Sequence, residues 1–301
     1  MPRFSVLIVT YNSSEAIVPC LRSIAAGPES GNSAEVIIVD NASVDDTTSL
    51  VRNGFPGVRL IENNRNSGFA AAVNQAAAIA NGEFLLILNP DTVVNEGFFA
   101  GLMKFFASHA EAGVAGCRIV DAAGNQIPSV WHDPSFGTVA CEVFLPYNTA
   151  LKLITGTPGD TRRVDMVSGA CMAVRREVFQ RLGGFDKRFF MYYEDADFCL
   201  RTRRDGFSVY FLPQISAFHG GGGSTKDRDL FYQRIWKSKM MFLKKHRNPL
   251  SYLITLAMVV VGISLRIACY FSLGTIMFSK PLMRLGKSYS LALSAVLSPG
   301  T

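Results

Sequence analysis

The 301-residue chain lacks the paired cysteines that cross-link small secreted domains or bind zinc. Its six cysteines show no Cys-x-x-Cys spacing and no regular interval. They are Cys20, Cys117, Cys141, Cys171, Cys199 and Cys269. A disulfide framework or a zinc knuckle is therefore not expected, and we predict reduced thiols in a protein core.

Two nucleotide-binding motifs are also missing. No G-x-G-x-x-G follows the first apolar run, and no G-x-x-x-x-G-K-[ST] occurs anywhere in the chain. This argues against dinucleotide redox chemistry and against a Walker-type nucleotidase. The N-terminus reads Met-Pro-Arg and runs directly into an apolar segment without the h-region of a signal peptide. We therefore expect no signal peptide and place the bulk of the protein in the cytoplasm.

Charged residues are scarce, at 18% against 49% hydrophobic residues, and the mean hydropathy is +0.20. Much of the apolar excess falls after Asn248. Pro249 to Leu265 is near the lower limit for crossing a bilayer, Arg266 interrupts it, and Ile267 to Phe278 is too short to span alone. One long span would bury Arg266 at a cost of roughly 2.5–3.5 kcal/mol or more.

Basic residues flank this tail on both sides. They are Lys237, Lys239, Lys244, Lys245 and Arg247 before it, and Lys280, Arg284 and Lys287 after it. Because positive flanks stay in the cytoplasm, we favour a re-entrant or interfacial helical hairpin with Arg266 at its surface-facing bend. A buried helix pair in a soluble homo-oligomer is the alternative. With a modest net charge of +6, we expect a membrane partner and no nucleic acid.

Short apolar runs alternate with helical segments over the first ninety residues. Strands are predicted at Phe4–Thr10, Glu35–Val39, Val58–Glu62 and Phe84–Leu88, and helices at Glu15–Ala26, Asp45–Asn53 and Gly68–Ala80. This alternation predicts an α/β fold with a doubly wound, mostly parallel sheet flanked by helices. The second half is less regular. There we predict a strand over Met166–Val174 and helices over Arg176–Leu182 and Asp195–Asp205.

Polar residues stand at the ends of three predicted strands, where such sheets bind their ligands. They are Thr10, Tyr11 and Asn12, then Asp40, Asn41 and Ser43, then Asp91 and Thr92. Any one of them could simply form a turn. Their convergence on one crevice favours a binding site. Asp91, held by the stiff Asn89-Pro90 pair, is well placed to bind a divalent cation that bridges two phosphates.

A second polar group lies further along the chain. Glu194, Asp195 and Asp197 place three carboxylates in four residues, which either cap a helix or provide a general base. His219 precedes four glycines, Gly220 to Gly223. A structural histidine before a hinge is one interpretation. A metal ligand with a mobile flap is the one that we favour.

Seven stretches of the chain resemble family 2 glycosyltransferases of the GT-A fold, and among them the bacterial rhamnosyltransferases. They are SVLIVTYN (5–12), EVIIVDNASVDDT (35–47), NRNSGFAAAVN (64–74), LNPDT (88–92), SGACMAVRREVF (168–179), GGFDKRFFMYYEDADFCLR (183–201) and FHGGGGS (218–224). The resemblance covers roughly residues 3–245. It implies a catalytic domain over 1–245, followed by a membrane-associated helical tail over 246–301.

The resemblance also implies site residues for an inverting, single-displacement transfer. The nucleotide sugar would be bound by Thr10, Tyr11, Asn12, Asp40 (at the pyrimidine base), Asn41, Ser43, Asn66, Gly68, Asn89 and Asp91. Asn89 replaces the first Asp of the family's Asp-x-Asp motif, so Mg²⁺ or Mn²⁺ would rest on Asp91 and His219. Asp195 would be the base with Glu194 beside it, although either could take the proton. Gly169 and Asp197 would lie on the acceptor side.

The best functional hypothesis is transfer of rhamnose from dTDP-rhamnose to a polyprenyl-diphosphate-linked glycan. It would proceed at the cytoplasmic face of a bacterial inner membrane, in cell-envelope polysaccharide synthesis. Two alternatives stay open at this point. One keeps the fold and uses a UDP-hexose donor, and the other is a non-catalytic membrane scaffold.

Overall fold

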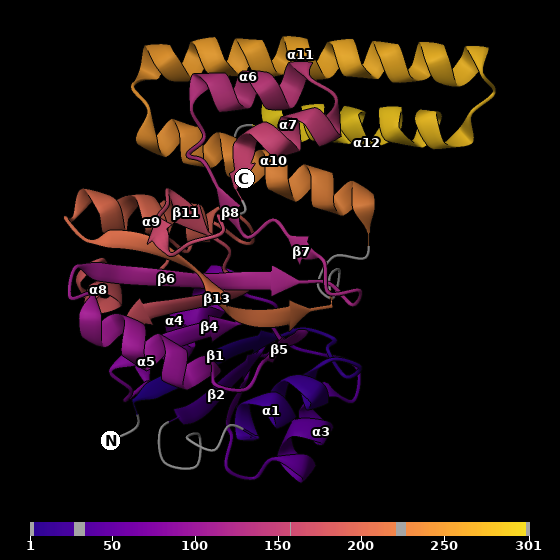
Figure 1. The fold of residues 1–301 in the computed structure, drawn as a ribbon. Coiled ribbons are helices and arrows are strands. Elements are labelled where there is room, and N and C mark those ends of the chain that lie inside the picture. The colour runs from indigo at the N-terminus through magenta and orange to yellow at the C-terminus, as the bar shows by residue number, and fades with distance from the viewer. Residues whose placement is uncertain (1–2, 27–33, 157, 221–226, 299–301) are drawn as a thin grey trace. The chain divides into compact units, whose positions relative to one another are not determined.

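The computed structural model describes residues 3–26, 34–156, 158–220 and 227–298 (Figure 1). The chain divides into two compact units. The sheet unit contains Met1–Trp131, Gly156–Phe190 and Glu194–Ser224. The helical unit contains His132–Thr155, Met191–Tyr193 and Thr225–Thr301. The predicted border at residue 245 lies one residue before the end of helix α10 (Arg228–His246), which belongs to the helical unit as a whole.

The sheet unit is built around one large sheet, whose main path runs β10-β13-β6-β12-β4-β1-β2-β3. These strands are β1 (Phe4–Thr10), β2 (Ala34–Asp40), β3 (Arg59–Glu62), β4 (Phe84–Leu88), β6 (Ala112–Val120), β10 (Arg162–Arg163), β12 (Cys171–Arg175) and β13 (Ser208–His219). Two more strands extend it, β5 (Thr92–Val94) beside β13 and β7 (Gln126–Ile127) beside β6. The four strands predicted in the first half are all present.

Strands β1 to β4 are parallel, which sends their carboxyl ends to one edge. The register places Thr10 opposite Asp40 and Ile8 opposite Leu88. Every residue of β1 and β4 is buried, as expected for strands covered on both faces. The parallel core carries the predicted α/β architecture, with β12 inserted antiparallel between β4 and β6.

Helices cover this sheet. They are α1 (Ile17–Ala25), α3 (Thr47–Gly54), α4 (Phe69–Ala78), α5 (Phe98–Ser108), α8 (Arg176–Arg181) and α9 (Glu194–Arg204). The alanine-rich α4 packs on β1 and β2 through Ala70, Ala72, Val73 and Ala76. Because its side chains are short, α4 can lie close to the sheet and support the loop that precedes it.

The strand predicted over Met166–Val174 is wrong in its middle. Two strands replace it: β11 (Met166–Val167), which pairs with β8 (Val130–Trp131), and β12, which joins the main sheet. Residues 168–170 leave the strand between them. The chain turns here because the backbone N–H of Gly169 donates to the Asp195 carboxylate instead of a strand partner.

The helical unit contains α6 (Phe136–Phe144), α7 (Tyr147–Ile154), α10 (Arg228–His246), α11 (Pro249–Ile276) and α12 (Lys280–Leu297). Strand β9 (Thr155–Gly156) lies where the chain passes between the units. Among the described residues, α11 is the one helix that is long and apolar enough to cross a membrane. Helices α11 and α12 run side by side (Figure 1).

The predicted bend at Arg266 is wrong. Helix α11 runs unbroken through Arg266, and the chain reverses at residues 277–279 instead. The charge of Arg266 does not end the helix because its guanidinium finds acceptors within the helical unit, on the backbone carbonyls of Glu142 and Val143.

All six cysteines are free. Four of them, Cys20, Cys117, Cys171 and Cys199, are buried as predicted, whereas Cys141 is half-buried and Cys269 is exposed. Burial, followed by the nearby charge of Asp91, raises the pKa of the Cys20 thiol to about 12. This thiol therefore stays protonated at neutral pH and behaves as a small apolar core residue.

Gly82, between α4 and β4, offers a test of this close packing. A Cβ at Gly82 would lie 2.5 Å from the backbone nitrogen of Ser5 and 2.6 Å from the carbonyl carbon of Phe4. Because backbone of a buried strand cannot move aside, we expect Gly82→Ala to lower the free energy of unfolding by about 1–3 kcal/mol. Gly54→Ala is the matched control, since no atom lies within 4 Å of its added Cβ. Urea denaturation of the two variants should separate them, and equal midpoints would contradict the packing described.

Candidate active site

The end of β2 carries a buried carboxylate that joins two loops. Asp40 Oδ1 accepts hydrogen bonds from Thr10 Oγ1 at 2.7 Å and from Ser43 Oγ at 2.5 Å. Its Oδ2 accepts from the Ser43 backbone N–H at 2.8 Å. Thr10 and Asp40 are both buried. The structure therefore brings Thr10, Asp40 and Ser43 together, and Asp40 fixes the turn that follows β2.

The loop after β1 is held against the same turn. The Asn12 backbone N–H donates to Ser43 Oγ at 2.8 Å, and Asn12 Oδ1 accepts from the Val44 N–H at 2.9 Å. Asn12 takes the left-handed region with φ 52°, which asparagine tolerates better than most residues. Tyr11 remains 44% exposed beside this loop. An exposed ring on a fixed backbone is suited to stacking on a flat ligand.

Asp45 completes this attachment and was not singled out from the sequence. Its carboxylate accepts from the backbone N–H of Ser14 at 3.1 Å and from both the N–H and the hydroxyl of Thr47. Burial alone would raise the pKa of Asp45, but these hydrogen bonds outweigh it and lower the pKa to about 2. Asp45 thus stays ionised and ties the loop after β1 to the start of α3.

Asn41 organises the loop between β3 and α4. Its Oδ1 accepts from Asn63 Nδ2 at 3.0 Å and from Ser67 Oγ at 3.0 Å, while its Nδ2 donates to the Gly68 carbonyl at 3.2 Å. Asn66 Oδ1 accepts from the Gly68 N–H at 3.0 Å. Asn41, Asn66 and Gly68 therefore lie together, and their contact with a nucleotide stays a prediction.

Only glycine fits at position 68. Its φ is +86°, and an added Cβ would lie 2.6 Å from the carbonyl oxygen of Phe190. The next residue, Phe69, donates its backbone N–H to that same oxygen at 2.7 Å. The start of α4 is thus packed directly on the segment that precedes the acidic cluster.

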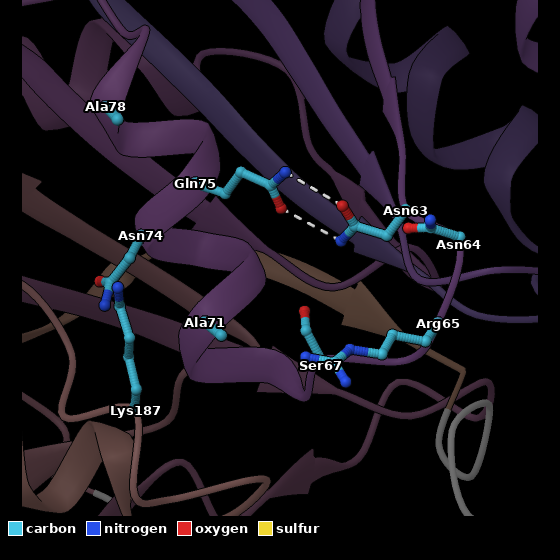
Figure 2. Close-up of a pocket in the computed structure, with 9 residues that line it drawn as sticks. All are labelled: Asn63, Asn64, Arg65, Ser67, Ala71, Asn74, Gln75, Ala78 and Lys187. Atoms are coloured by element: carbon cyan, nitrogen blue, oxygen red, sulfur yellow. Dashed lines mark hydrogen bonds between the residues drawn. The ribbon is translucent and has the colours of Figure 1, made fainter.

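A polar pocket of about 410 Å³ opens beside this loop (Figure 2). It is lined by Asn63, Asn64, Arg65, Ser67, Ala71, Asn74, Gln75, Ala78 and Lys187. The amides of Asn63 and Gln75 bond reciprocally across it, at 3.0 and 3.1 Å (Figure 2). Because Asn63 also donates to Asn41, one wall of the pocket is continuous with the loop between β3 and α4 that Asn41 organises.

Asp91 and His219 meet at the end of β4. His219 Nε2 lies 3.2 Å from Asp91 Oδ1 and 3.2 Å from Asn89 Nδ2. Strand β13 brings His219 there by pairing it with Thr92 of β5. The backbone N–H of Gly220 donates to the Asp91 carbonyl at 3.0 Å. The rest of the predicted glycine flap, 221–223, lies outside the described residues.

Asp195 is connected to the turn of Asn89 and Asp91 through the backbone of two adjacent residues, Gly169 and Ala170. The Gly169 N–H donates to Asp195 Oδ2 at 2.9 Å, and the carbonyl of the next residue, Ala170, accepts from the Asn89 N–H at 3.0 Å. Asp195 Oδ1 accepts from the Ala196 N–H at 2.8 Å. The turn that breaks the predicted strand therefore connects the acidic cluster with the Asn89–Asp91 turn.

Glu194 differs from Asp195 in its hydrogen bonding. Its Oε2 is buried and has no hydrogen-bond partner among the described residues. Burial and then the charge of Asp195 raise the pKa of Glu194 well above its usual range. Burial also raises the pKa of Asp195, where the two backbone N–H groups oppose the rise. Protonation at neutral pH is thus favoured more strongly at Glu194 than at Asp195.

Asp197 points into the protein. It is fully buried, and its Oδ2 accepts from Arg201 Nε at 2.7 Å. Arg201 in turn donates to the carbonyls of Leu182 and Gly184 at 2.8 and 2.7 Å. This pair supports the turn at Gly183–Gly184, and the contact of Asp197 with an acceptor stays a prediction.

The raised pKa of Glu194 has a consequence for stability. Above the pKa of an unfolded glutamate the unfolded chain loses this proton while the folded chain keeps it, so stability falls as pH rises. The slope for one proton is at most about 1.4 kcal/mol per pH unit. Glu194→Gln removes this titrating group. We expect urea denaturation at pH 5 and pH 8 to show a larger loss of stability in the parent than in Glu194→Gln. Parallel losses in both proteins would contradict a protonated Glu194.

The chain is similar to known proteins in sequence and in fold. The model of the family "Glycosyl transferase family 2" matches residues 5–183. An N-acetylglucosaminyl-diphospho-decaprenol L-rhamnosyltransferase of Mycobacterium tuberculosis is 29% identical over 238 residues, covering 73% of this chain and 76% of the relative. The rhamnosyltransferase WbbL of Escherichia coli is 26% identical over 221 residues, covering 71% and 82%.

The fold is found again in solved structures. A mannosyltransferase of Pyrobaculum calidifontis, in complex with GDP-Man and Mn²⁺, superposes with a TM-score of 0.62 at 19% identity, covering 98% of this chain and 86% of that one. The family match extends over more than half of the chain and contains the strand ends described above. The chain therefore belongs to glycosyl transferase family 2, as a rhamnosyltransferase-like glycosyltransferase of the GT-A fold.

Proposed function

We propose that the protein is a metal-dependent, inverting glycosyltransferase that moves rhamnose from dTDP-rhamnose to a lipid-linked glycan. The observation that carries the proposal is the pair of adjacent residues Gly169 and Ala170. One binds the carboxylate of Asp195, and the other binds the turn of Asn89 and Asp91. A general base and a diphosphate-binding turn fixed to the same backbone segment are what a single displacement needs.

Asp195 is the proposed base. Its carboxylate is oriented by the N–H groups of Gly169 and Ala196, and its raised pKa makes it a stronger base than an exposed aspartate. It takes the proton of the acceptor hydroxyl while the acceptor oxygen forms a bond to the anomeric carbon. The bond from that carbon to the diphosphate breaks on the opposite face, so the configuration inverts and no covalent intermediate forms. Glu194, kept neutral, avoids a second negative charge beside the base.

Asp91 and His219 fit a divalent cation. Neighbouring ligands of an octahedral ion with bonds of 2.0–2.1 Å stand about 3 Å apart, close to the 3.2 Å between Asp91 Oδ1 and His219 Nε2. No group of three or more His, Cys, Asp or Glu side chains is gathered as a metal site in the described part of the chain. Two protein ligands suffice for Mg²⁺ or Mn²⁺ when phosphate oxygens and water fill the shell. Such an ion, when bound, neutralises charge on the leaving diphosphate.

The donor loops are arranged in advance of binding. Asp40 binds Thr10 and Ser43, and Ser43 in turn accepts from the Asn12 N–H. Asn41 holds the loop of residues 63–68, and none of these hydrogen bonds needs a ligand. Tyr11 is exposed on the loop after β1 and is the side chain that we expect to stack on the base. Contacts of Asn12, Ser43 and Asn66 with the nucleotide belong to the same proposal.

The acceptor and the location are inferred from the relatives and from α11. The mycobacterial relative is named for an N-acetylglucosaminyl-diphospho-decaprenol acceptor. Helix α11 is long and apolar, and basic residues flank it. We therefore place the reaction at the cytoplasmic face of a bacterial inner membrane, in cell-envelope glycan synthesis, with a polyprenyl-diphosphate glycan as acceptor. A UDP-hexose donor is the alternative, since thymine and uracil differ by one methyl group.

A donor screen tests the proposal. Full-length protein is incubated with Mg²⁺ or Mn²⁺ and dTDP-rhamnose, UDP-glucose, UDP-galactose or UDP-N-acetylglucosamine, with and without a polyprenyl-diphosphate N-acetylglucosamine acceptor. We expect release of dTDP that increases with the acceptor. Asp195→Asn should lower kcat at least 100-fold and change the donor KM only a few-fold, because the base acts in the chemical step.

The exposed Asp160→Asn is the matched control for loss of a carboxylate, since Asp160 forms a surface ion pair with nearby Arg162. Release of UDP from one hexose donor would replace rhamnose in the proposal. Nucleotide binding without turnover, with every donor and with the lipid acceptor present, would favour the scaffold. A severe loss in Glu194→Gln together with an active Asp195→Asn would exchange the roles of the two residues.

If Asp91 and His219 bind the metal, one substitution should raise the affinity for Mn²⁺ and another should lower it. Asn89→Asp places a carboxylate beside Asp91 and His219, so we expect at least tenfold tighter Mn²⁺ binding in the presence of dTDP. Asp91→Ala should weaken Mn²⁺ binding at least tenfold. Electron paramagnetic resonance of free Mn²⁺ measures both without turnover. Asn95→Asp, which adds a charge beside Ser216, controls for the charge alone, and equal affinities of all four proteins would exclude this site.

A further inference from the structure

Helix α11 has the length and composition of a membrane span, but its neighbours in the helical unit occupy its middle. Its 28 residues would extend about 42 Å, enough to cross the hydrocarbon core of a bilayer. A helix that crosses must present apolar surface around its whole circumference, or lie against other apolar segments. The contacts of α11 with α6 therefore decide whether α11 can cross.

Helix α6 lies directly against the middle of α11 (Figure 1). A Cβ at Gly262 would come within 2.6 Å of Val143 Cβ, so the glycine allows the two helices to touch. Val259 and Ile263 on the same face are fully buried, as are Val139 and Val143 on α6. One face of α11 is thus covered by a short helix that belongs to residues 132–155.

Arg266 fastens the end of α6 to this position. Its guanidinium donates to the carbonyls of Glu142 and Val143, both at 2.9 Å, and to that of Leu145. It also lies over the ring of Tyr289 on α12, at 5.4 Å. The last carbonyls of a helix lack partners within the helix and carry partial negative charge, so Arg266 satisfies them and is itself neutralised in part.

This attachment makes a crossing orientation costly. Arg266 lies ten residues before the end of α11, about 15 Å along the axis, which in a spanning helix is near the bilayer centre. Glu142 and its ion-pair partner Lys239 would enter the hydrocarbon together with Arg266. Buried charges are costly in hydrocarbon even when they are paired. The covered side of α11 therefore has to remain outside the hydrocarbon.

The opposite face of α11 carries no charge and is mostly apolar, with Ser264, Ser272 and Thr275 exposed among its apolar side chains. Arg266 is the one charged residue between Pro249 and Ile276. The exposed apolar side chains are Leu250, Leu253, Ile254, Val261, Leu265, Phe271, Leu273 and Ile276, followed by Met277 and Phe278. Leu250 is 68% exposed near one end and Phe278 93% exposed beyond the other. We name these ten side chains the apolar face of α11.

Basic residues border the apolar face at both ends. Lys244 and Arg247 precede α11, and both are exposed. On α12, Lys280, Arg284 and Lys287 are exposed at helical spacing. Each Lys or Arg near an anionic membrane surface is attracted to the headgroups. Apolar surface bordered by cations matches the boundary between acyl chains and anionic headgroups.

We propose that α11 lies in the membrane interface and does not cross the bilayer, with its apolar face in the acyl region and α6 on the cytoplasmic side. The occupant of this face is an anionic lipid surface. The inference refines the membrane location proposed above and is independent of the sugar donor. Arg266 serves as the anchor that holds α6 on α11 and thereby keeps α11 out of a crossing orientation.

The test asks which side of the membrane each end of α11 faces. In a Cys141→Ser, Cys269→Ser background, which removes the two cysteines that are not buried, Lys244→Cys and Lys280→Cys each place one exposed thiol just beyond an end of α11, outside the apolar face. Spheroplasts and inverted vesicles from expressing cells are treated with a membrane-impermeant maleimide. We expect both thiols to react in inverted vesicles and neither to react in spheroplasts. Reaction of one end in spheroplasts would show that α11 crosses and would overturn the proposal.

Flotation with vesicles tests the lipid chemistry. The purified full-length protein should float with phosphatidylglycerol vesicles at least tenfold better than with phosphatidylcholine vesicles. Ile254→Glu combined with Leu265→Glu should abolish flotation, and Leu50→Glu on α3, an exposed leucine of the sheet unit, should not. Flotation unchanged by the double substitution, or a dimer that forms through this face without vesicle binding, would overturn the proposal. Binding of dTDP by the same preparations shows whether a failure here is separate from a failure of the proposed function.

Discussion

A side-chain amide buried at the end of a strand must find its hydrogen-bond partners inside the protein, and Asn41 does so by holding the donor-side loop. Its position is set by the parallel pairing of β2 with β1. Its amide then determines where Asn63, Ser67 and Gly68 lie, since each bonds to it. Removing either partner of one of these hydrogen bonds would leave a buried polar atom unpaired, which lowers the free energy of unfolding by about 1–3 kcal/mol. The loop that we assign to the nucleotide is therefore ordered by the sheet, and binding does not have to order it.

The same reasoning extends to the other side of the site through residues 168–170. A regular strand there would have used the Gly169 N–H in the sheet. Because the chain turns instead, that N–H orients Asp195, and the neighbouring Ala170 carbonyl holds the Asn89 turn. A displacement of this turn would move the proposed base and the proposed metal ligands together. A transferase needs this property, because the attacking and leaving groups must stay in line through the reaction.

Much of the fold could be predicted because β1 to β4 are continuous apolar runs with polar residues at their ends. The parts that could not be predicted depend on contacts between distant residues. Residues 166–174 read as apolar throughout, and nothing in that pattern shows that Asp195 takes the Gly169 N–H. Arg266 reads as an interruption because its acceptors, the carbonyls of 142, 143 and 145, lie more than 120 residues away. Tyr192 and Tyr193 take left-handed φ values of 69° and 68°. Tyrosine rarely adopts this conformation, so the sequence gives no reason to expect it.

The sequence also left open which carboxylate of the Glu194–Asp195 pair acts as base, because residue type alone does not show the surroundings of each carboxylate. Their environments separate them. Asp195 receives two backbone N–H groups, which favour its charged form, whereas one buried oxygen of Glu194 has no partner in the part of the chain that the structure describes. Two neighbouring carboxylates that share a buried site cannot both ionise easily, so the one with donors takes the charge and the other keeps its proton. The hydrogen bond from Gly169 thus assigns the proposed roles.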